Sequence, residues 1–229
     1  MSQSFRPLAS LPTVLTVPGL DNSGPDHWQS LWEDLLADCH RVDMGDWSSP
    51  RREAWVERLD RRIDAQKGPA VLVAHSLGCL AVAWWAHRRW QVVRRHTILG
   101  ALLVAPPCTE RGAASSRIAD FRPTPRTPLP FPSLLVASRN DPCAGFEASS
   151  ALAEAWGSQL VDAGQAGHIN ADSGLGVWPE GLSLLEGLMT SVSDARRAVR
   201  TRHAAIRDHR SHEQGGQEHR MMPQQAFAC

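Results

Sequence analysis

The chain has 229 residues, and its 24 Lys and Arg balance its 24 Asp and Glu, so the formal net charge is zero. This length is sufficient for one sizeable hydrophobic core, and we expect one folded domain and a tail. The balanced charge gives no overall attraction to nucleic acid or to an acidic membrane surface. The composition therefore favours a small-molecule partner.

The N-terminal segment and the cysteines indicate the compartment. The first 12 residues, treated as an extension, lack the apolar core of a signal peptide, and no later run resembles a membrane span. The five cysteines are scattered and form no CxxC pair, so their spacing suggests neither a disulfide framework nor a zinc site. We expect a cytoplasmic protein with reduced thiols, no bound metal and no membrane contact.

Apolar, β-branched runs bounded by turn signals predict buried strands, and amphipathic stretches of helical period lie between them. A polar stretch, Arg41–Asp46, is a candidate edge strand. Strands that alternate with helices predict an α/β fold, with a mostly parallel central sheet covered by helices on both faces. The expected strands are 13–17, 70–74, 98–104, 134–137 and 159–161, and the expected helices are 27–38, 51–66, 77–90, 146–156 and 179–189.

Two segments depart from this alternation. Residues 108–132 are broken by prolines and are longer than an ordinary connection, so we expect an arch near the active-site face without a helix. Residues 191–229 are rich in Arg, His and Gln and poor in large apolar residues, which predicts a largely disordered tail. The HEQGGQEH run in this tail is interpreted as solvated rather than metal-binding. The folded domain is expected to span residues 13–190.

The most specific motif lies in Pro69–Ala83, where an apolar strand leads into Ser76 and then directly into a helical pattern. This is the strand, nucleophile and helix context of the G-x-S-x-G nucleophile elbow. In such a tight turn, the positions two before and two after the serine approach each other and need small side chains. Ala74, in place of the usual glycine, and Gly78 meet this requirement. Ser76 is therefore the predicted nucleophile.

An oxyanion hole beside this nucleophile requires two backbone amides. The amide of Leu77 lies at a helix N-terminus, where developing negative charge is stabilised. The loop after the first strand supplies the second donor in this architecture, and Leu20 is the first candidate and Gly19 the second. Gly19 and Gly24 fit neither the dinucleotide-binding nor the P-loop spacing. We therefore expect no nucleotide and no other cofactor.

Two further residues complete a predicted triad. Asp141 follows the strand 134–137, and His168 lies on a glycine-rich loop after the last predicted strand. The chain order Ser, Asp, His is the order that this fold requires. Asn140–Pro142 by itself has the composition of an ordinary turn, so the conjunction of all three residues supports the prediction. Other residues nearby are interpreted as structural histidines (His27, His75) and as packed or idle thiols (Cys79, Cys143).

Four segments resemble one family. They are Val17-Pro-Gly-Leu-Asp-Asn-Ser-Gly-Pro-Asp-His-Trp-Gln, Ala74-His-Ser-Leu-Gly-Cys, Ser138-Arg-Asn-Asp-Pro and Ala166-Gly-His-Ile-Asn. Over residues 13–190 the chain is similar to the small serine hydrolase family that contains the animal retinoblastoma-binding serine hydrolase, especially its bacterial members. The resemblance implies an α/β-hydrolase fold without a large cap domain and a triad of Ser76, Asp141 and His168. It also implies hydrolysis of an ester, thioester or amide.

Two alternatives remain open from the sequence. One is a protein-interaction module that retains the triad, because a fold does not guarantee an activity. The other is an acyltransferase or perhydrolase, in which something other than water accepts the acyl group. The expected partner is a small-molecule acyl substrate, and no particular protein partner is predicted.

Overall fold

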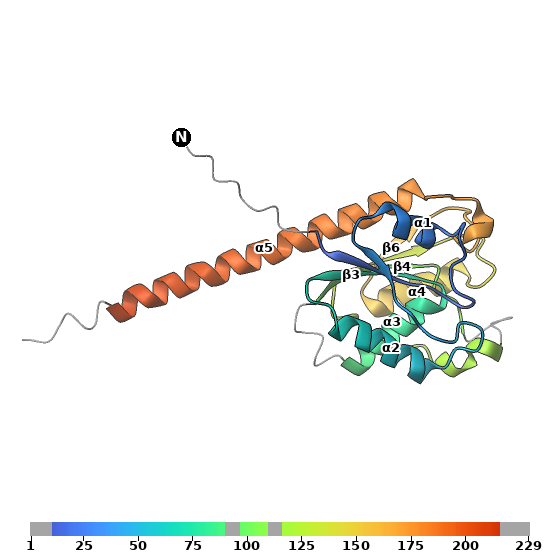
Figure 1. Ribbon diagram of the computed structural model, residues 1–229, viewed down its shortest axis with the longest axis horizontal. Helices are drawn as coiled ribbons and strands as arrows, with labels where there is room; N and C mark the ends of the chain where they lie inside the picture. The colour runs from blue at the N-terminus through green and yellow to red at the C-terminus, as the bar shows by residue number, and fades with distance from the viewer. Residues whose placement is uncertain (1–10, 90–96, 110–115, 216–229) are drawn as a thin grey trace, which may run out of the picture. The chain divides into compact units, whose positions relative to one another are not determined.

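A computed structural model describes residues 11–89, 97–109 and 116–215 of the chain (Figure 1). The chain divides into two compact units, Met1–Val192 and Ser193–Cys229. The first unit contains one sheet of six parallel strands in the order β2-β1-β3-β4-β5-β6. The predicted α/β fold with a parallel sheet is confirmed. The strands are β1 (Thr13–Val17), β2 (Cys39–Arg41), β3 (Ala70–His75), β4 (Ile98–Val104), β5 (Ser133–Ala137) and β6 (Gln159–Asp162).

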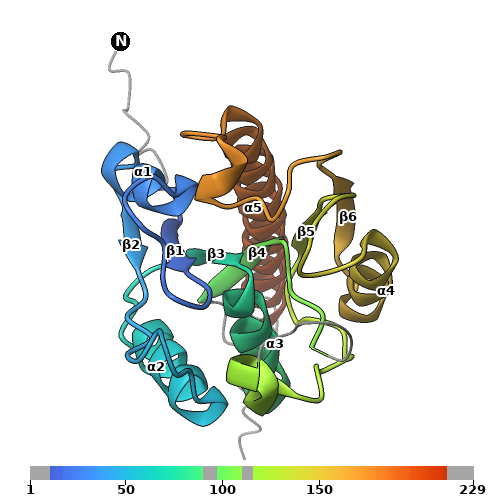
Figure 2. The ribbon, with the colours of Figure 1, turned by 90° about the vertical axis from the view of Figure 1, so that its right-hand side faces the viewer.

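Helices cover both faces of this sheet (Figure 2). Successive strand residues point to opposite faces, so Leu15 lies in one hydrophobic core and Val14 in the other. The central strands are therefore apolar on both sides, as expected for a parallel sheet. One core lies against α2 (Arg52–Asp64), α3 (Leu77–Arg89) and α4 (Phe146–Trp156), and the other lies against α1 (Trp28–Leu35) and the first part of α5 (Pro179–Gly215), up to Val192.

The edge strand β2 precedes the predicted segment. We expected a strand within Arg41–Asp46, whereas the strand observed is Cys39–Arg41. Its backbone pairs with Val14–Thr16 of β1, and the amide of Val42 continues this pairing to the carbonyl of Thr16 at 2.9 Å. The chain then turns at Gly45, whose φ is 83° and whose amide donates to the carboxylate of Asp43. A strand that pairs on one side at an edge needs no apolar pattern, so the polarity of this segment was a poor guide.

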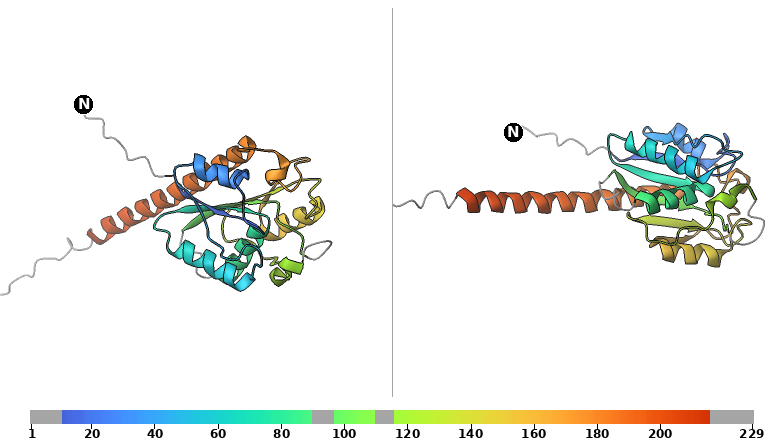
Figure 3. Two further views of the ribbon diagram at one scale, coloured as in Figure 1. Left: turned by 45° about the vertical axis from the view of Figure 1, so that its right-hand side comes forward. Right: turned by 90° about the horizontal axis from the view of Figure 1, so that it is seen from below.

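The proline-rich connection between β4 and β5 contains a short helix that the sequence did not predict. The element is a 3-10 helix, η2 (Ser116–Phe121), which buries Ile118 and Phe121. Phe121 packs edge-on against Trp55 of α2, with 5.7 Å between ring centroids. The segment is free of proline and ends before Pro123, which explains how a helical turn forms in a proline-rich stretch. The described parts of this connection form no large cap over the sheet (Figure 3).

The C-terminal region differs from the predicted disordered tail. Residues 191–215 are helical and belong to α5, while the last part of the predicted tail, residues 216–229, lies outside the described residues. Residues 188–214 contain neither proline nor glycine and are rich in Ala and Arg, which are strong helix formers. Low hydrophobicity alone was therefore insufficient to predict disorder here. No helix in the described ranges combines the length and the apolar character needed to cross a membrane.

Candidate active site

Ser76 lies between the end of β3 at His75 and the start of α3 at Leu77. Its φ is 50°, a left-handed backbone conformation that is uncommon for residues other than glycine. The Ser76 amide donates to the carbonyl of Val104 in the neighbouring strand β4, at 2.9 Å. This geometry corresponds to a strained turn between a strand and a helix, which presents the Ser76 side chain at the carboxyl edge of the sheet.

Gly78 meets a steric requirement that comes from another strand. A Cβ atom at this position would lie 2.1 Å from the carbonyl oxygen of Val17 and 2.7 Å from that of Pro18. The sequence predicted a small residue here because Ala74 approaches it within the turn. The structure adds a second reason, because the end of β1 lies directly against the first turn of α3.

Replacing Gly78 with alanine is expected to lower the free energy of unfolding by about 1–3 kcal/mol, because overpacking against backbone atoms cannot be relieved by a side-chain rotation. Denaturant unfolding followed by Trp fluorescence would measure this loss. Gly187→Ala in α5 is the matched control, since its Cβ would meet nothing within 4 Å. The control should be more stable than the natural protein by about 0.5–1 kcal/mol. Equal stabilities of the two variants would contradict the steric argument.

Two loops at the carboxyl edge of the sheet bring Asp141 and His168 together. Asp141 follows β5 and His168 follows β6, and these neighbouring parallel strands end at the same edge. The side-chain oxygen of Asn140 accepts a hydrogen bond from the amide of Gly167 at 2.8 Å. The hydroxyl of Ser138 accepts one from the amide of Ala166 at 2.9 Å. These two hydrogen bonds join the loop segments that lead to Asp141 and His168.

The side chains of the three predicted triad residues form a continuous hydrogen-bond path. The His168 Nε2 atom lies 2.9 Å from Ser76 Oγ, and its Nδ1 atom lies 2.9 Å and 3.0 Å from the two carboxylate oxygens of Asp141. The side chains of His168 and Asp141 are 14% and 3% exposed. A nucleophile, a base within hydrogen-bond reach and a buried carboxylate that orients the base are the components of a catalytic triad.

Two buried side chains hold the backbone beside His168. The Nε2 atom of His75 lies 3.0 Å from the carbonyl oxygen of His168, so a neutral His75 can donate this hydrogen bond. The indole of Trp28 donates to the carbonyl of Ile169 at 2.8 Å. Sequence analysis assigned His75 only a general structural role and did not predict either contact. The two contacts join residues 93 and 141 positions apart in the chain, so no local pattern could indicate them.

The histidines around the site differ in their electrostatics. Burial lowers the pKa of His75 well below its usual value, and burial together with Arg41 and His168 lowers the pKa of His27 to about 4. Burial also acts to lower the pKa of His168, but the hydrogen bonds that its ring makes to Asp141 and Cys143 outweigh it and raise this pKa to about 9. His75 and His27 are therefore neutral neighbours of an imidazole that is stabilised in its charged form.

The loop after β1 lies directly against the nucleophile. A Cβ atom on Gly19 would lie 2.8 Å from the Cβ of Ser76 and 3.2 Å from the amide nitrogen of Leu77. Next in the chain is Leu20, and within the described part of the chain neither the Leu20 nor the Leu77 amide donates a hydrogen bond to another residue. Both expected oxyanion donors are thus in the neighbourhood of Ser76.

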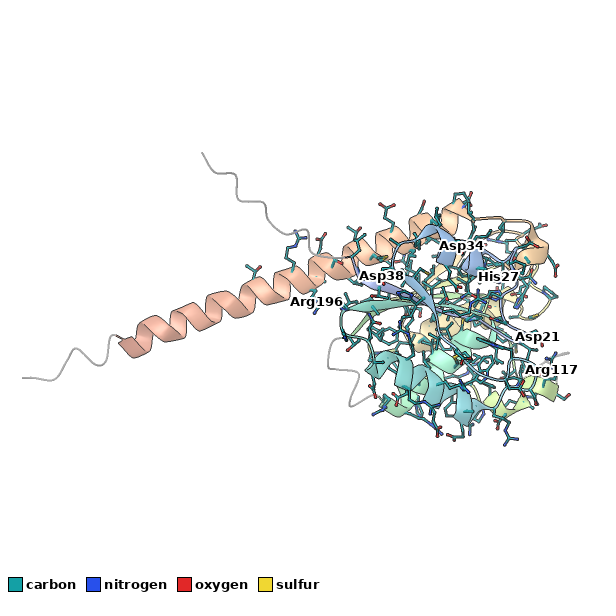
Figure 4. The ribbon with its side chains drawn as sticks, in the orientation of Figure 1. Asp21, His27, Asp34, Asp38, Arg117 and Arg196 are labelled. Carbon is teal, nitrogen blue, oxygen red and sulfur yellow. The ribbon has the colours of Figure 1, made fainter. Side chains whose placement is uncertain are left out.

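The position of the β1 loop is fixed by contacts at Asp21. The amide of Asp21 donates to the carbonyl of Trp47 at 3.0 Å, and its carboxylate accepts two hydrogen bonds from the guanidinium of Arg117 in η2. Arg117 also donates to the carbonyl of Ser48 at 2.7 Å and 2.9 Å. Figure 4 labels Asp21 and Arg117, which lie side by side at one end of the sheet. The proline-rich connection therefore reaches the loop that carries the candidate oxyanion donor.

Comparisons with known proteins support the assignment of the fold and of the general chemistry. A family model described as "Serine hydrolase" matches residues 14–187. A protein from Pectobacterium atrosepticum described as a YdeN-like hydrolase is 34% identical, with a TM-score of 0.68 over 79% of this chain and 91% of its own. The ydeN gene product of B. subtilis is 22% identical, with a TM-score of 0.57 over 78% of this chain and 99% of its own. A search of curated proteins found no significant match.

Proposed function

This chain belongs to the serine hydrolase family, and we propose that it hydrolyses an ester, thioester or amide through an acyl-enzyme on Ser76. The observation that carries this proposal is the hydrogen-bond path from Asp141 through His168 to Ser76. The substrate in this proposal is a small molecule with an acyl group. The YdeN-like relative is itself described as a hydrolase, which is consistent with this reaction class.

The first half-reaction forms the acyl-enzyme. His168 Nε2 accepts the proton of the Ser76 hydroxyl while the oxygen attacks the acyl carbon, and the resulting oxyanion accepts hydrogen bonds from the amides of Leu20 and Leu77. The carbon–heteroatom bond of the substrate then breaks, and His168 donates its proton to the departing alcohol, thiol or amine. Asp141 stabilises the imidazolium in both steps and keeps the Nδ1–H tautomer in place.

The second half-reaction releases the acyl group. A water molecule loses a proton to His168 Nε2 and attacks the acyl carbon of the ester on Ser76. When the tetrahedral intermediate collapses, the Ser76 oxygen regains a proton from His168 and a carboxylic acid is released. The neutral state of His75 is important here, because a second positive charge beside His168 would oppose the imidazolium.

Labelling with a fluorophosphonate probe tests this proposal directly, because the probe forms a bond only with an activated serine. We expect the natural protein to be labelled at Ser76, as mapped by mass spectrometry, and to hydrolyse short nitrophenyl esters. The Ser76→Ala variant should do neither while keeping the natural melting temperature. An unlabelled natural protein without ester hydrolysis would contradict the proposal and would favour the protein-interaction module. Labelling with acyl transfer to an added alcohol that is faster than hydrolysis would favour the acyltransferase.

A further inference from the structure

Cys143 lies beside the Asp141–His168 pair and takes no part in the proposed reaction. One ligand atom from each of Asp141, Cys143 and His168 can be chosen so that all three lie within 4.8 Å of one another. Nothing else in the described ranges forms such a group of three His, Cys, Asp or Glu side chains. Cys143 is exposed to solvent, whereas the carboxylate of Asp141 is almost completely buried. The cluster therefore has a buried carboxylate on one side and a thiol that is open to solvent on the other.

The backbone holds the Cys143 side chain near this pair. The Cys143 amide donates to the carboxylate of Asp141 at 2.8 Å, and the Cys143 carbonyl accepts a hydrogen bond from the amide of Cys108 at 3.0 Å. The Asp141 carboxylate already accepts hydrogen bonds from the Cys143 amide and from His168 Nδ1. It therefore does not need the Cys143 thiol as a hydrogen-bond partner. The thiol therefore adds a third potential ligand beside the Asp141–His168 pair.

The donor set indicates which cation could bind. A thiolate, an imidazole nitrogen and a carboxylate oxygen are characteristic ligands of Zn²⁺, whereas Mg²⁺ and Ca²⁺ prefer oxygen ligands. In a tetrahedral zinc site with bonds of about 2.0–2.3 Å, the ligand atoms lie roughly 3.3–3.8 Å apart. The three ligand atoms lie within 4.8 Å of one another, which is close to that spacing, and Cys143 is the exposed member of the group. Solvent can supply the fourth ligand.

We propose that Asp141, Cys143 and His168 form an inhibitory Zn²⁺ site. Nδ1 is the ring nitrogen that faces Asp141, so it is the His168 atom that a cation shared with this carboxylate would bind. Zinc displaces the proton from Nδ1, the neutral ring carries its proton on Nε2, and the Cys143 thiol releases its proton to solvent. Nε2 then donates to Ser76 instead of accepting the serine proton. Inhibition depends on the proposed function, but binding of the metal doesn't.

Binding is tested on the full chain by alkylation of Cys143 and by titration with zinc chloride. Zn²⁺ should protect Cys143 from iodoacetamide, as mapped by mass spectrometry, and Mg²⁺ should not. Mapping to Cys143 separates this site from zinc bound by the histidines of the C-terminal region. In calorimetry, Cys143→Ser should lack the tightest binding event or weaken it at least about tenfold, since loss of even an outer-shell group typically costs 10–100-fold. Equal zinc binding by the natural protein and Cys143→Ser would overturn the proposal.

Cys108→Ser is the matched control, because Cys108 lies on the adjacent loop and is outside the cluster. In the activity arm, Zn²⁺ should inhibit ester hydrolysis by the natural protein and by Cys108→Ser, and a chelator should restore it. The concentration for half-inhibition of Cys143→Ser should be at least about tenfold higher. Equal inhibition of Cys143→Ser and Cys108→Ser would overturn the proposal. If no hydrolysis is detected at all, the proposed function fails, while alkylation protection still decides the metal site.

Discussion

Replacing Asp141 with asparagine is expected to lower kcat for nitrophenyl ester hydrolysis about ten-thousandfold, the size of effect typical when the orienting carboxylate of a triad becomes an amide. The Cys143 amide donates to Oδ1 of Asp141 at 2.8 Å, so the oxygen of the new side chain is retained at that position. Its NH₂ group then takes the place of Oδ2, 3.0 Å from Nδ1 of His168, and competes with the retained oxygen, which lies 2.9 Å from the same nitrogen. When Nδ1 accepts a hydrogen bond from this NH₂ group, the ring proton lies on Nε2 and the base is removed from Ser76.

The pH dependence of the rate gives a second readout for the same substitution. Ester hydrolysis requires neutral His168, whose pKa is raised to about 9 despite burial, chiefly by the hydrogen bond to Asp141. The rate of the natural protein should therefore rise with pH and reach half of its plateau near pH 9. In Asp141→Asn the midpoint should move to lower pH, because that stabilisation of the imidazolium is lost. The plateau should remain low, since deprotonation does not correct the tautomer.

Asp172→Asn is the control for this pair of measurements. Asp172 is an exposed carboxylate in the 3-10 helix η3 (Ala171–Ser173), close in sequence to His168 but directed to Asn170. The Asp172→Asn variant should have the same rate and the same midpoint of the pH dependence as the natural protein. A rate of Asp141→Asn within tenfold of the natural rate would show that this carboxylate does not orient the base.

Periodicity and turn signals were sufficient to predict most of the first unit. Five of the six strands and the helices α1 to α4 follow predicted runs whose limits differ from the structure by only a few residues, and α5 begins at the predicted residue, Pro179. The strand β2 was misplaced because an edge strand is defined by its backbone pairing with β1 rather than by an apolar pattern. The helix over residues 191–215 was missed because composition was interpreted as disorder although helix formers were abundant.

The candidate site was predictable only where its residues follow strands. Ser76, Asp141 and His168 each follow a strand of a parallel sheet, and the carboxyl ends of these strands meet at one edge. No comparable sequence rule predicts the residues that fix the positions of these three side chains. The contacts of His75 with His168 and of Arg117 with Asp21 join segments that are far apart in the sequence, so they depend on the finished fold. The three-residue cluster at Cys143 has the same origin and could not be found from cysteine spacing.

Gly19→Ala is expected to lower kcat about a hundredfold to a thousandfold, which is the usual effect of losing one oxyanion donor. A Cβ at this position would lie 2.8 Å from the Cβ of Ser76 and 3.1 Å from the carbonyl of His75, and contacts this short require one of the two segments to move. The elbow is fixed by the hydrogen bond from Ser76 to Val104, so the displacement should fall on the β1 loop and carry the Leu20 amide away.

Gly24→Ala in the same loop separates this effect from a general loss of loop flexibility, because its Cβ would meet nothing within 4 Å. Its kcat should equal that of the natural protein. Steady-state kinetics should show that Gly19→Ala changes kcat far more than KM, since the oxyanion forms only on the way to the acyl-enzyme. Melting temperatures would establish that both variants are folded during the assay. If Gly19→Ala and Gly24→Ala had the same kcat, the amide of Leu20 would not be the second oxyanion donor.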